Sequence, residues 1–155
     1  MQVLAIDETL FRMAFNRDVD VEIYPQSAYL DHQTGEIRWV YENDEHAEME
    51  DGIPAVENKA TRQRITETPD RFLEIPGLNH DDHHKILQEF LASDWTKDKE
   101  AESRAYAAYS GSIGGWIQRV NDDRAIHSYY DFRDGRTKEL AEEFLRRQGI
   151  KPQWK

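Results

Sequence analysis

The residues best suited to metal chemistry are the histidines of the run His80-Asp81-Asp82-His83-His84. Histidine and carboxylate side chains are common ligands of divalent metals such as Zn²⁺. On a helix His80 and His84 share one face, where they could hold a metal with a carboxylate from elsewhere. Acids in a first turn also complement the helix dipole, and histidines there are commonly solvated. We therefore predict no metal ligand and keep a metal-assisted hydrolase using His80, His83 or His84 as an alternative.

Nucleophilic and acid-base chemistry finds little support in the sequence. The segment SGSIGG at 110–115 contains neither a GxSxG nor a GxxxxGK[ST] pattern, and no lysine follows that could hold a phosphate. The neighbouring acids Asp122-Asp123 and Glu142-Glu143 would need burial to shift their pKa, and adjacent acids on helices mostly face water. We predict no catalytic residue and no cofactor, and we favour a protein that is not an enzyme.

Residue types suited to recognition gather near the C-terminus. Tryptophan, tyrosine and arginine supply large contact area and fixed hydrogen-bond geometry at interfaces. The apolar spacing around Trp116 places it in a core, whereas Tyr129 and Tyr130 point roughly 100° apart on a helix, so that one of them can be exposed. Arg133 beside Asp134 could equally form an internal ion pair. We predict that a partner-binding surface contains Tyr129, Tyr130, Arg133 and Asp134.

The elements that must position these residues are helices in the second half of the chain. Two amphipathic stripes recur at helical spacing and predict a common interior: Ile113, Trp116, Ile117 and Val120, then Leu140, Ala141, Phe144 and Leu145. Residues typical of helix starts and ends divide this region into several predicted helices. The predicted helices run from Asn79 to Ser93, from Thr96 to Gly111, over 113–120, from Asp122 or Asp123 past Phe132, and from Arg136 to Arg147 with Gly149 as a C-cap.

The first half of the chain predicts a small sheet. Alternating apolar residues indicate strands at 19–26 and 71–75, and a hairpin joins 27–31 to 37–41 through a turn at Gly35. A short helix precedes them at 8–16, because Asp7 can cap it. Residues 42–70 are acidic and poor in apolar residues, which is typical of a loop, a linker or a solvated helix.

Composition restricts the class of protein. The chain has 155 residues and no cysteine, which suits a single domain in a reducing cytosol. No basic leader is visible, and no run approaches the ~18 apolar residues of a membrane span, so we expect a cytoplasmic protein. The net charge of −11 makes nucleic acid an unlikely partner, since the field repels phosphate. An acidic nucleic-acid mimic, an inhibitor from a mobile element, remains an alternative.

Several segments in a fixed order resemble a bacterial family known as uncharacterised protein family 0158. They are YLDHQTGEI at Tyr29 to Ile37, RFLEIP at Arg71 to Pro76, EFL at Glu89 to Leu91, Gly111 leading to Ile113 and Trp116, YYDFRD at Tyr129 to Asp134, and EEFLRRQGI at Glu142 to Ile150. The resemblance implies a small α+β protein of the bacterial cytoplasm, and it carries no activity, cofactor or site residue. This chain has Gly114, Gly115 and Ile117 where the family pattern is basic.

These observations predict a single α+β domain over 1–155, with 42–70 as an acidic, flexible loop region. A small antiparallel sheet with a β-hairpin from the N-terminal half packs against a C-terminal helical bundle. For function we predict a non-enzymatic protein-interaction or regulatory module whose partner is a protein, with no membrane association.

Overall fold

The computed structural model describes residues 1–155, and the fold is α+β, as predicted. The chain forms two compact units. The first, here called the sheet unit, comprises Met1–Gly77 and Ala141–Lys155, and the second, the helical unit, comprises Leu78–Leu140. The prediction of one domain over the whole chain stays a prediction. No helix combines the length and the apolar character that crossing a membrane requires.

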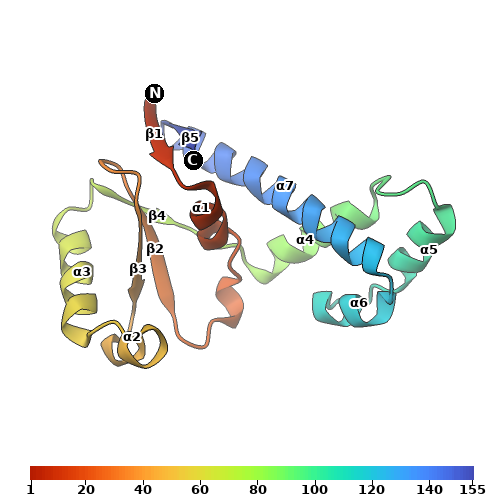
Figure 1. Cartoon of the computed structure of the whole chain (residues 1–155), viewed down its shortest axis with the longest axis horizontal. Helices are drawn as coiled ribbons and strands as arrows, with labels where there is room; N and C mark the ends of the chain where they lie inside the picture. The colour runs from red at the N-terminus through yellow and green to blue at the C-terminus, as the bar shows by residue number, and fades with distance from the viewer. The chain divides into compact units, whose positions relative to one another are not determined.

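The centre of the sheet unit is a three-stranded antiparallel sheet in the order β3-β2-β4 (Figure 1). The hairpin strands β2 (Gln26–Asp31) and β3 (Ile37–Tyr41) pair with Leu30 opposite Ile37. β4 (Phe72–Ile75) pairs with the other edge of β2. The predicted hairpin and the predicted strand beside it are therefore confirmed. The alternation of apolar side chains sets the register of these strands.

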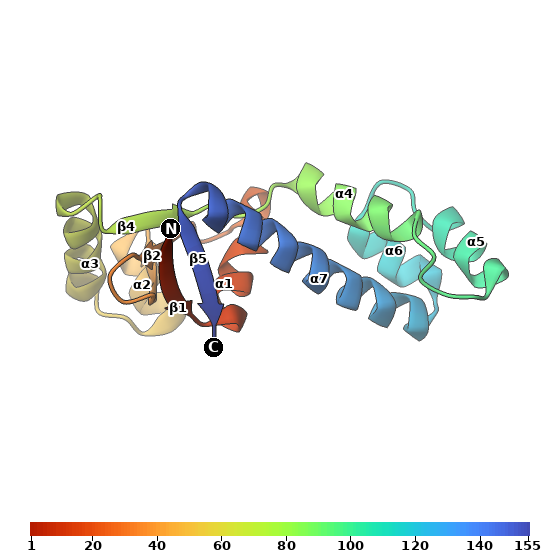
Figure 2. The same ribbon diagram turned by 90° about the horizontal axis from the view of Figure 1, so that it is seen from above.

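The structure contains two further strands that the sequence does not predict. β1 (Gln2–Ile6) and β5 (Ile150–Trp154) form a separate parallel pair, seen side by side in Figure 2. Leu4 and Ile6 of β1 are buried, whereas Ala5 between them is exposed. Pro152 in β5 lacks an N–H, which a single edge partner tolerates.

The strand predicted at 19–26 is wrong. Val19–Val21 form a short 3-10 turn, η1, in which the Asp18 side chain accepts a hydrogen bond from the Asp20 N–H. Ile23 is largely exposed. Alternating apolar residues do not make a strand here, because an aspartate side chain satisfies the local backbone and closes a turn instead.

Helices flank the strands of the sheet unit. α1 (Glu8–Phe15) is confirmed, with its predicted cap at Asp7, and it buries Phe11 and Phe15. The acidic region contains α2 (Asp44–Asp51) and α3 (Ala55–Glu67), so the solvated helix is the alternative found there. Ile65 of α3 joins the cluster that covers one side of the sheet with Val40 and Phe72.

The helical unit contains α4 (His80–Leu91), α5 (Lys99–Ala107), α6 (Ile113–Val120) and the start of α7 (Asp123–Arg147). α4 begins as predicted with a capping box between Asn79 and Asp82. The predicted cap of α5 at Thr96 is wrong, because the Asp98 side chain accepts hydrogen bonds from the N–H groups of the first turn. The helix also ends before Gly111, at Ala107.

The structure joins the last two predicted helices into α7, a single helix of 25 residues. Gly135 lies inside it without a break, since a glycine in a helix interior costs only about 1 kcal/mol. The common interior predicted for the two apolar stripes is not found, because most of the second stripe, from Ala141 on, belongs to the sheet unit. Trp116 lies in the core of the helical unit, and Leu145 lies in the sheet unit.

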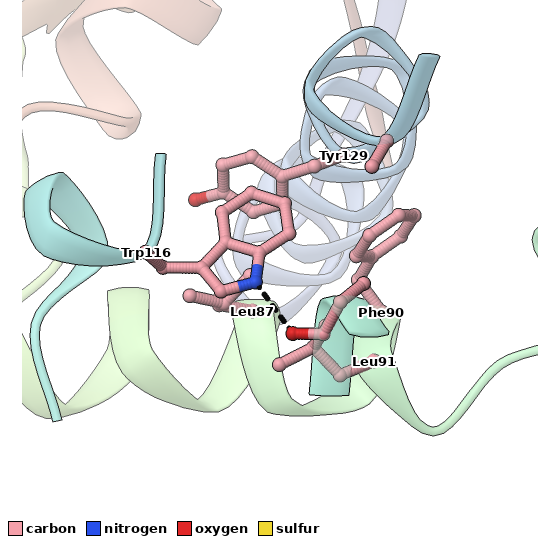
Figure 3. Packing of buried hydrophobic residues seen from close by; sticks show 7 residues of the cluster. Leu87, Phe90, Leu91, Trp116 and Tyr129 are labelled. Atoms are coloured by element: carbon pink, nitrogen blue, oxygen red, sulfur yellow. Dashed lines mark hydrogen bonds between the residues drawn. The ribbon is translucent and has the colours of Figure 1, made fainter. Parts of the chain in front are cut away.

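The core of the helical unit is built around Trp116, which is fully buried. Figure 3 shows its indole between α4 and α7, with Leu87, Leu91 and the rings of Phe90 and Tyr129 around it. The ring centroids of Trp116 and Tyr129 lie 5.4 Å apart, and the indole Nε1 donates a hydrogen bond of 2.9 Å to the Ala105 carbonyl oxygen. This cluster fixes where α7 places its outward side chains.

Gly35 at the tip of the hairpin leads to a first prediction. Its φ is +78°, and a Cβ there would lie 1.9 Å from the carbonyl oxygen of Ala5 in β1. We expect Gly35→Ala to lower the free energy of unfolding by about 2–4 kcal/mol in urea denaturation, because strain and a backbone clash add together. The control is Gly52→Ala, at φ +65° with open space around the Cβ, which carries only the conformational cost of about 1–2 kcal/mol. Equal losses for both variants would contradict the predicted clash.

Candidate functional site

The predicted partner-binding residues divide between core and surface. Tyr129 is 2% exposed and belongs to the core, where burial raises the pKa of its hydroxyl. Tyr130 is 36% exposed. The guanidinium carbon of Arg133 lies 4.7 Å from the centroid of the Tyr130 ring, and Arg133 Nη2 lies 3.3 Å from Asp134 Oδ1. The structure thus brings Tyr130, Arg133 and Asp134 together and assigns Tyr129 to packing.

The three histidines at the start of α4 do not all lie on one face of the helix. His83 lies on the buried face of the helix. The rings of His80 and His84 are 4.2 Å apart, and His84 Nδ1 lies 2.5 Å from the Tyr109 hydroxyl. No group of three or more histidine, cysteine, aspartate or glutamate side chains could hold a metal ion. His84 therefore links α4 to the connection between α5 and α6 through its ring contact and hydrogen bond with Tyr109.

A hollow of about 600 Å³ opens in the helical unit, where the sequence predicts no binding site. It lies between the connection from α4 to α5 and the first turns of α7. Two short segments far apart in the sequence supply its wall, which consists of Trp95, Thr96, Asp123, Arg124, His127 and Ser128. The one sequence signal for it is a tryptophan in the polar connection SDWTKD.

Local contacts hold the wall of the hollow in place. Trp95 stacks on the core ring of Phe90, with centroids 5.3 Å apart and planes inclined by 30°. Its Nε1 is buried without an acceptor. The Asp122 side chain accepts a hydrogen bond of 3.0 Å from the Arg124 N–H and so begins α7. Stacking on one side and a capped helix start on the other give the hollow a fixed frame.

The exposed side of α7 continues from the hollow. His127, Tyr130, Asp131 and Asp134 are spaced i, i+3, i+4 and i+7 and therefore share one helix face, here called the α7 contact face. His127 Nε2 lies 3.6 Å from Asp131 Oδ2. Because His127 also lines the hollow, the hollow and the α7 contact face form one continuous surface.

No protein-family model, curated protein or solved structure matches this chain. The resemblance to uncharacterised protein family 0158 stays a prediction. The function of the surface must therefore be inferred from its own geometry.

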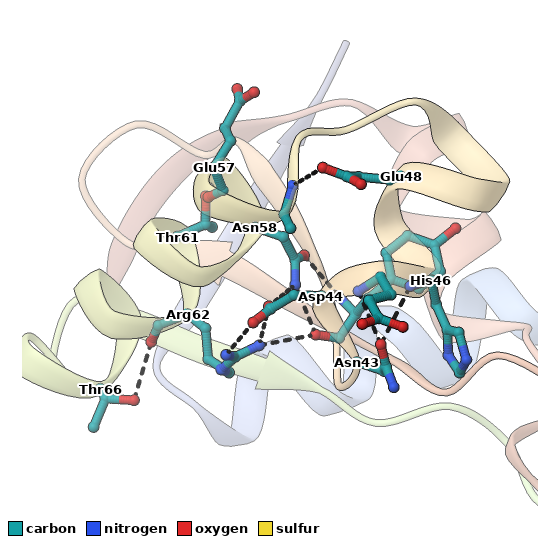
Figure 4. A network of polar contacts seen from close by, with 12 residues as sticks. Asn43, Asp44, His46, Glu48, Glu57, Asn58, Thr61, Arg62 and Thr66 are labelled. Carbon is teal, nitrogen blue, oxygen red and sulfur yellow. Dashed lines mark hydrogen bonds and ion pairs between the residues drawn. The ribbon is translucent and has the colours of Figure 1, made fainter.

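The sheet unit contains a network of hydrogen bonds and an ion pair around Asn58 and Asp44, shown in Figure 4. Asn58 is buried and bonds to both the N–H and the C=O of Tyr41, at 3.0 Å each. Arg62 binds the Asp44 carboxylate through two nitrogens, at 2.7 and 3.0 Å. The Tyr41 hydroxyl donates to Asp51, and burial together with this bond raises the pKa of Tyr41 to about 12. These contacts tie α2 and α3 to β3, so we interpret the network as structural.

The network leads to a second prediction, for Asp44. Its hydrogen bonds with Arg62 and then Asn58 lower the pKa of the Asp44 carboxyl to about 2. The pair therefore stabilises the fold above the unfolded pKa of ~3.9, and this contribution is lost as the pH falls from about 4 to 2. We expect Arg62→Gln to raise the pKa of Asp44 toward ~3.9 in a carboxyl ¹³C NMR titration.

The control for Asp44 is Arg64→Gln, which removes an exposed arginine from the same helix. This variant should leave the pKa of Asp44 near 2. An unchanged pKa in Arg62→Gln would mean that the ion pair does not form in solution.

Proposed function

We propose that this chain is a non-enzymatic protein-interaction module, and that the α7 contact face and the adjoining hollow form its docking surface. The observation that carries the proposal is an exposed tyrosine held in place beside a hollow. Tyr130 is partly exposed, and Arg133 lies over its ring at 4.7 Å. Tyrosine and arginine are enriched among the residues that dominate binding energy at interfaces.

The fixed position of Tyr130 favours binding. A side chain that is ordered before a partner arrives loses less conformational freedom on binding, which costs about 0.5–1.5 kcal/mol for each mobile side chain. The cation-π contact with Arg133 and the ion pair of Arg133 with Asp134 supply this order. Tyr130 can therefore serve as an anchor, because its side chain already has the conformation in which it binds the partner.

The hollow extends the surface from a flat helix face to a concave one. Its volume of about 600 Å³ falls within the range of ligand pockets, roughly 300–1,000 Å³. Its wall combines one large aromatic ring with hydroxyl, imidazole and charged groups. Such a wall suits a protruding side chain of a partner segment whose backbone crosses the α7 contact face.

The place of action proposed here is the bacterial cytoplasm. The resemblance to uncharacterised protein family 0158 implies a bacterial source. The lack of cysteine suits a reducing compartment.

The test of this function is recovery of a partner from the native host by affinity purification and mass spectrometry. We expect Tyr130→Ala to lower recovery of the specific partner about tenfold without changing the melting temperature, since loss of an anchor residue costs about 1.4 kcal/mol or more. The matched control is Tyr106→Ala, which removes a tyrosine that is 68% exposed on α5. Equal recovery with Tyr130→Ala and the original chain, or an equal loss in Tyr106→Ala, would contradict the proposed surface.

A further inference from the structure

The charges around the hollow are unevenly balanced. Arg124 lies 3.9 Å from both Asp98 and Asp122, so its positive charge is already shared by two carboxylates. Asp123 lines the hollow and is exposed, and its carboxylate forms no hydrogen bond or ion pair within the chain. Asp131 adds another carboxylate next to His127. Acidic groups outnumber Arg124 at this surface, and the potential there attracts a cation.

Trp95 adds a second feature that suits a cation. Tryptophan is the best aromatic partner for cations, and the contact strengthens where water is excluded. The Trp95 indole packs against Phe90 on one side and forms part of the wall of the hollow. An aromatic wall and an unpaired carboxylate therefore meet in one concavity.

We infer that the hollow receives an arginine or lysine side chain of the partner segment. This inference rests on the proposed function and names the chemistry of the partner. The cation lies against the Trp95 ring and pairs with the Asp123 carboxylate. Arginine binds more tightly than lysine, because a planar guanidinium can stack on the indole and present two N–H groups to a carboxylate at once.

The test is an NMR titration of the ¹⁵N-labelled full chain at pH 7.5 with four capped tripeptides. Their central residues are arginine, lysine, citrulline and glutamate, and citrulline keeps the shape of arginine without its charge. We expect the arginine peptide to shift the Trp95 indole signal and the Ser128 amide signal. The lysine peptide should shift them less, and the other two should not. Raising the salt concentration should weaken the arginine peptide's binding, since an exposed ion pair is screened.

Two variants separate the charge of the hollow from the charge of the whole chain. We expect Asp123→Asn to weaken binding of the arginine peptide about fivefold, the loss that accompanies one exposed ion pair. Glu100→Gln removes one negative charge from an exposed position on α5 outside the hollow and should leave the affinity unchanged.

Three results would overturn the inference. Equal binding of the citrulline peptide would show a hollow that selects shape and not charge, and binding of the glutamate peptide alone would show the opposite charge preference. No shift with any peptide would remove the hollow as a receptor for single side chains. In each case the Tyr130→Ala experiment still decides the proposed function, because it measures the α7 contact face with the native partner.

Discussion

Trp116→Ala is expected to destabilise the helical unit by about 3–5 kcal/mol, the usual cost of removing a large buried aromatic side chain. Trp116 is fully buried, and its ring meets those of Phe90 and Tyr129 at centroid distances of 6.2 and 5.4 Å. The substitution also deletes the hydrogen bond from Nε1 to the Ala105 carbonyl oxygen. The unit loses its central packing residue and a buried polar contact together.

Amide hydrogen exchange measures this loss locally, because the protection of α4 and α6 reports the free energy of opening the helical unit. We expect protection there to fall by roughly two to four powers of ten, following the 1.4 kcal/mol that each factor of ten represents. The control Tyr106→Ala removes an exposed aromatic ring and should change stability by no more than about 0.5 kcal/mol. A loss below 1 kcal/mol for Trp116→Ala would mean that the core is not centred on this residue.

Arg71→Ala is expected to destabilise the sheet unit by about 3–5 kcal/mol at neutral pH, because it leaves a buried carboxylate without its partner. Asp31 is 1% exposed at the end of β2. Arg71 Nε and Nη2 bind its two oxygens at 3.0 and 2.8 Å. The control Arg38→Ala breaks an exposed pair with Glu36 in the same hairpin and should cost at most about 1 kcal/mol.

The pH dependence of Arg71→Ala distinguishes an ion pair from simple packing. Hydrogen bonding from Arg71 holds the pKa of Asp31 well below its usual range. The lowered pKa stabilises the fold above the unfolded value of ~3.9, and this contribution is lost progressively as the pH falls below it. The difference in unfolding free energy between the original chain and Arg71→Ala should therefore narrow in urea titrations from pH 7 to pH 3. A difference that stays constant with pH would show that Arg71 stabilises the fold by packing alone.

The parts of the fold that the sequence predicts are those in which local signals determine structure. The turn at Gly35, the cap at Asp7 and the capping signal at Asn79 each lie next to the element they define. The pairing of β1 with β5 depends on contacts between opposite ends of the chain, which no local pattern records. The continuous α7 is another case, because burial of Tyr129 before Gly135 and of Leu145 after it outweighs a weak helix breaker.

Local sequence signals also predict one part of the candidate site, the pair Tyr129 and Tyr130, but not the hollow. The angular separation of Tyr129 and Tyr130 on a helix indicates one buried and one exposed tyrosine, and the structure has this arrangement. The hollow could not be foreseen, because Trp95 and His127 belong to segments that only the folded helical unit brings together. A single tryptophan in a polar connection does not predict which helix or strand its side chain will contact.

The most direct measurement of the docking surface is site-specific photo-crosslinking in the native host. A photoreactive phenylalanine analogue replaces Tyr130 in one variant and Tyr106 in the other, since both side chains are exposed and both lie on helices. We expect the analogue at position 130 to form a single dominant adduct with a protein partner, and the analogue at position 106 to form none. Adducts of equal yield at both positions, or an adduct at position 106 alone, would contradict a docking surface on α7.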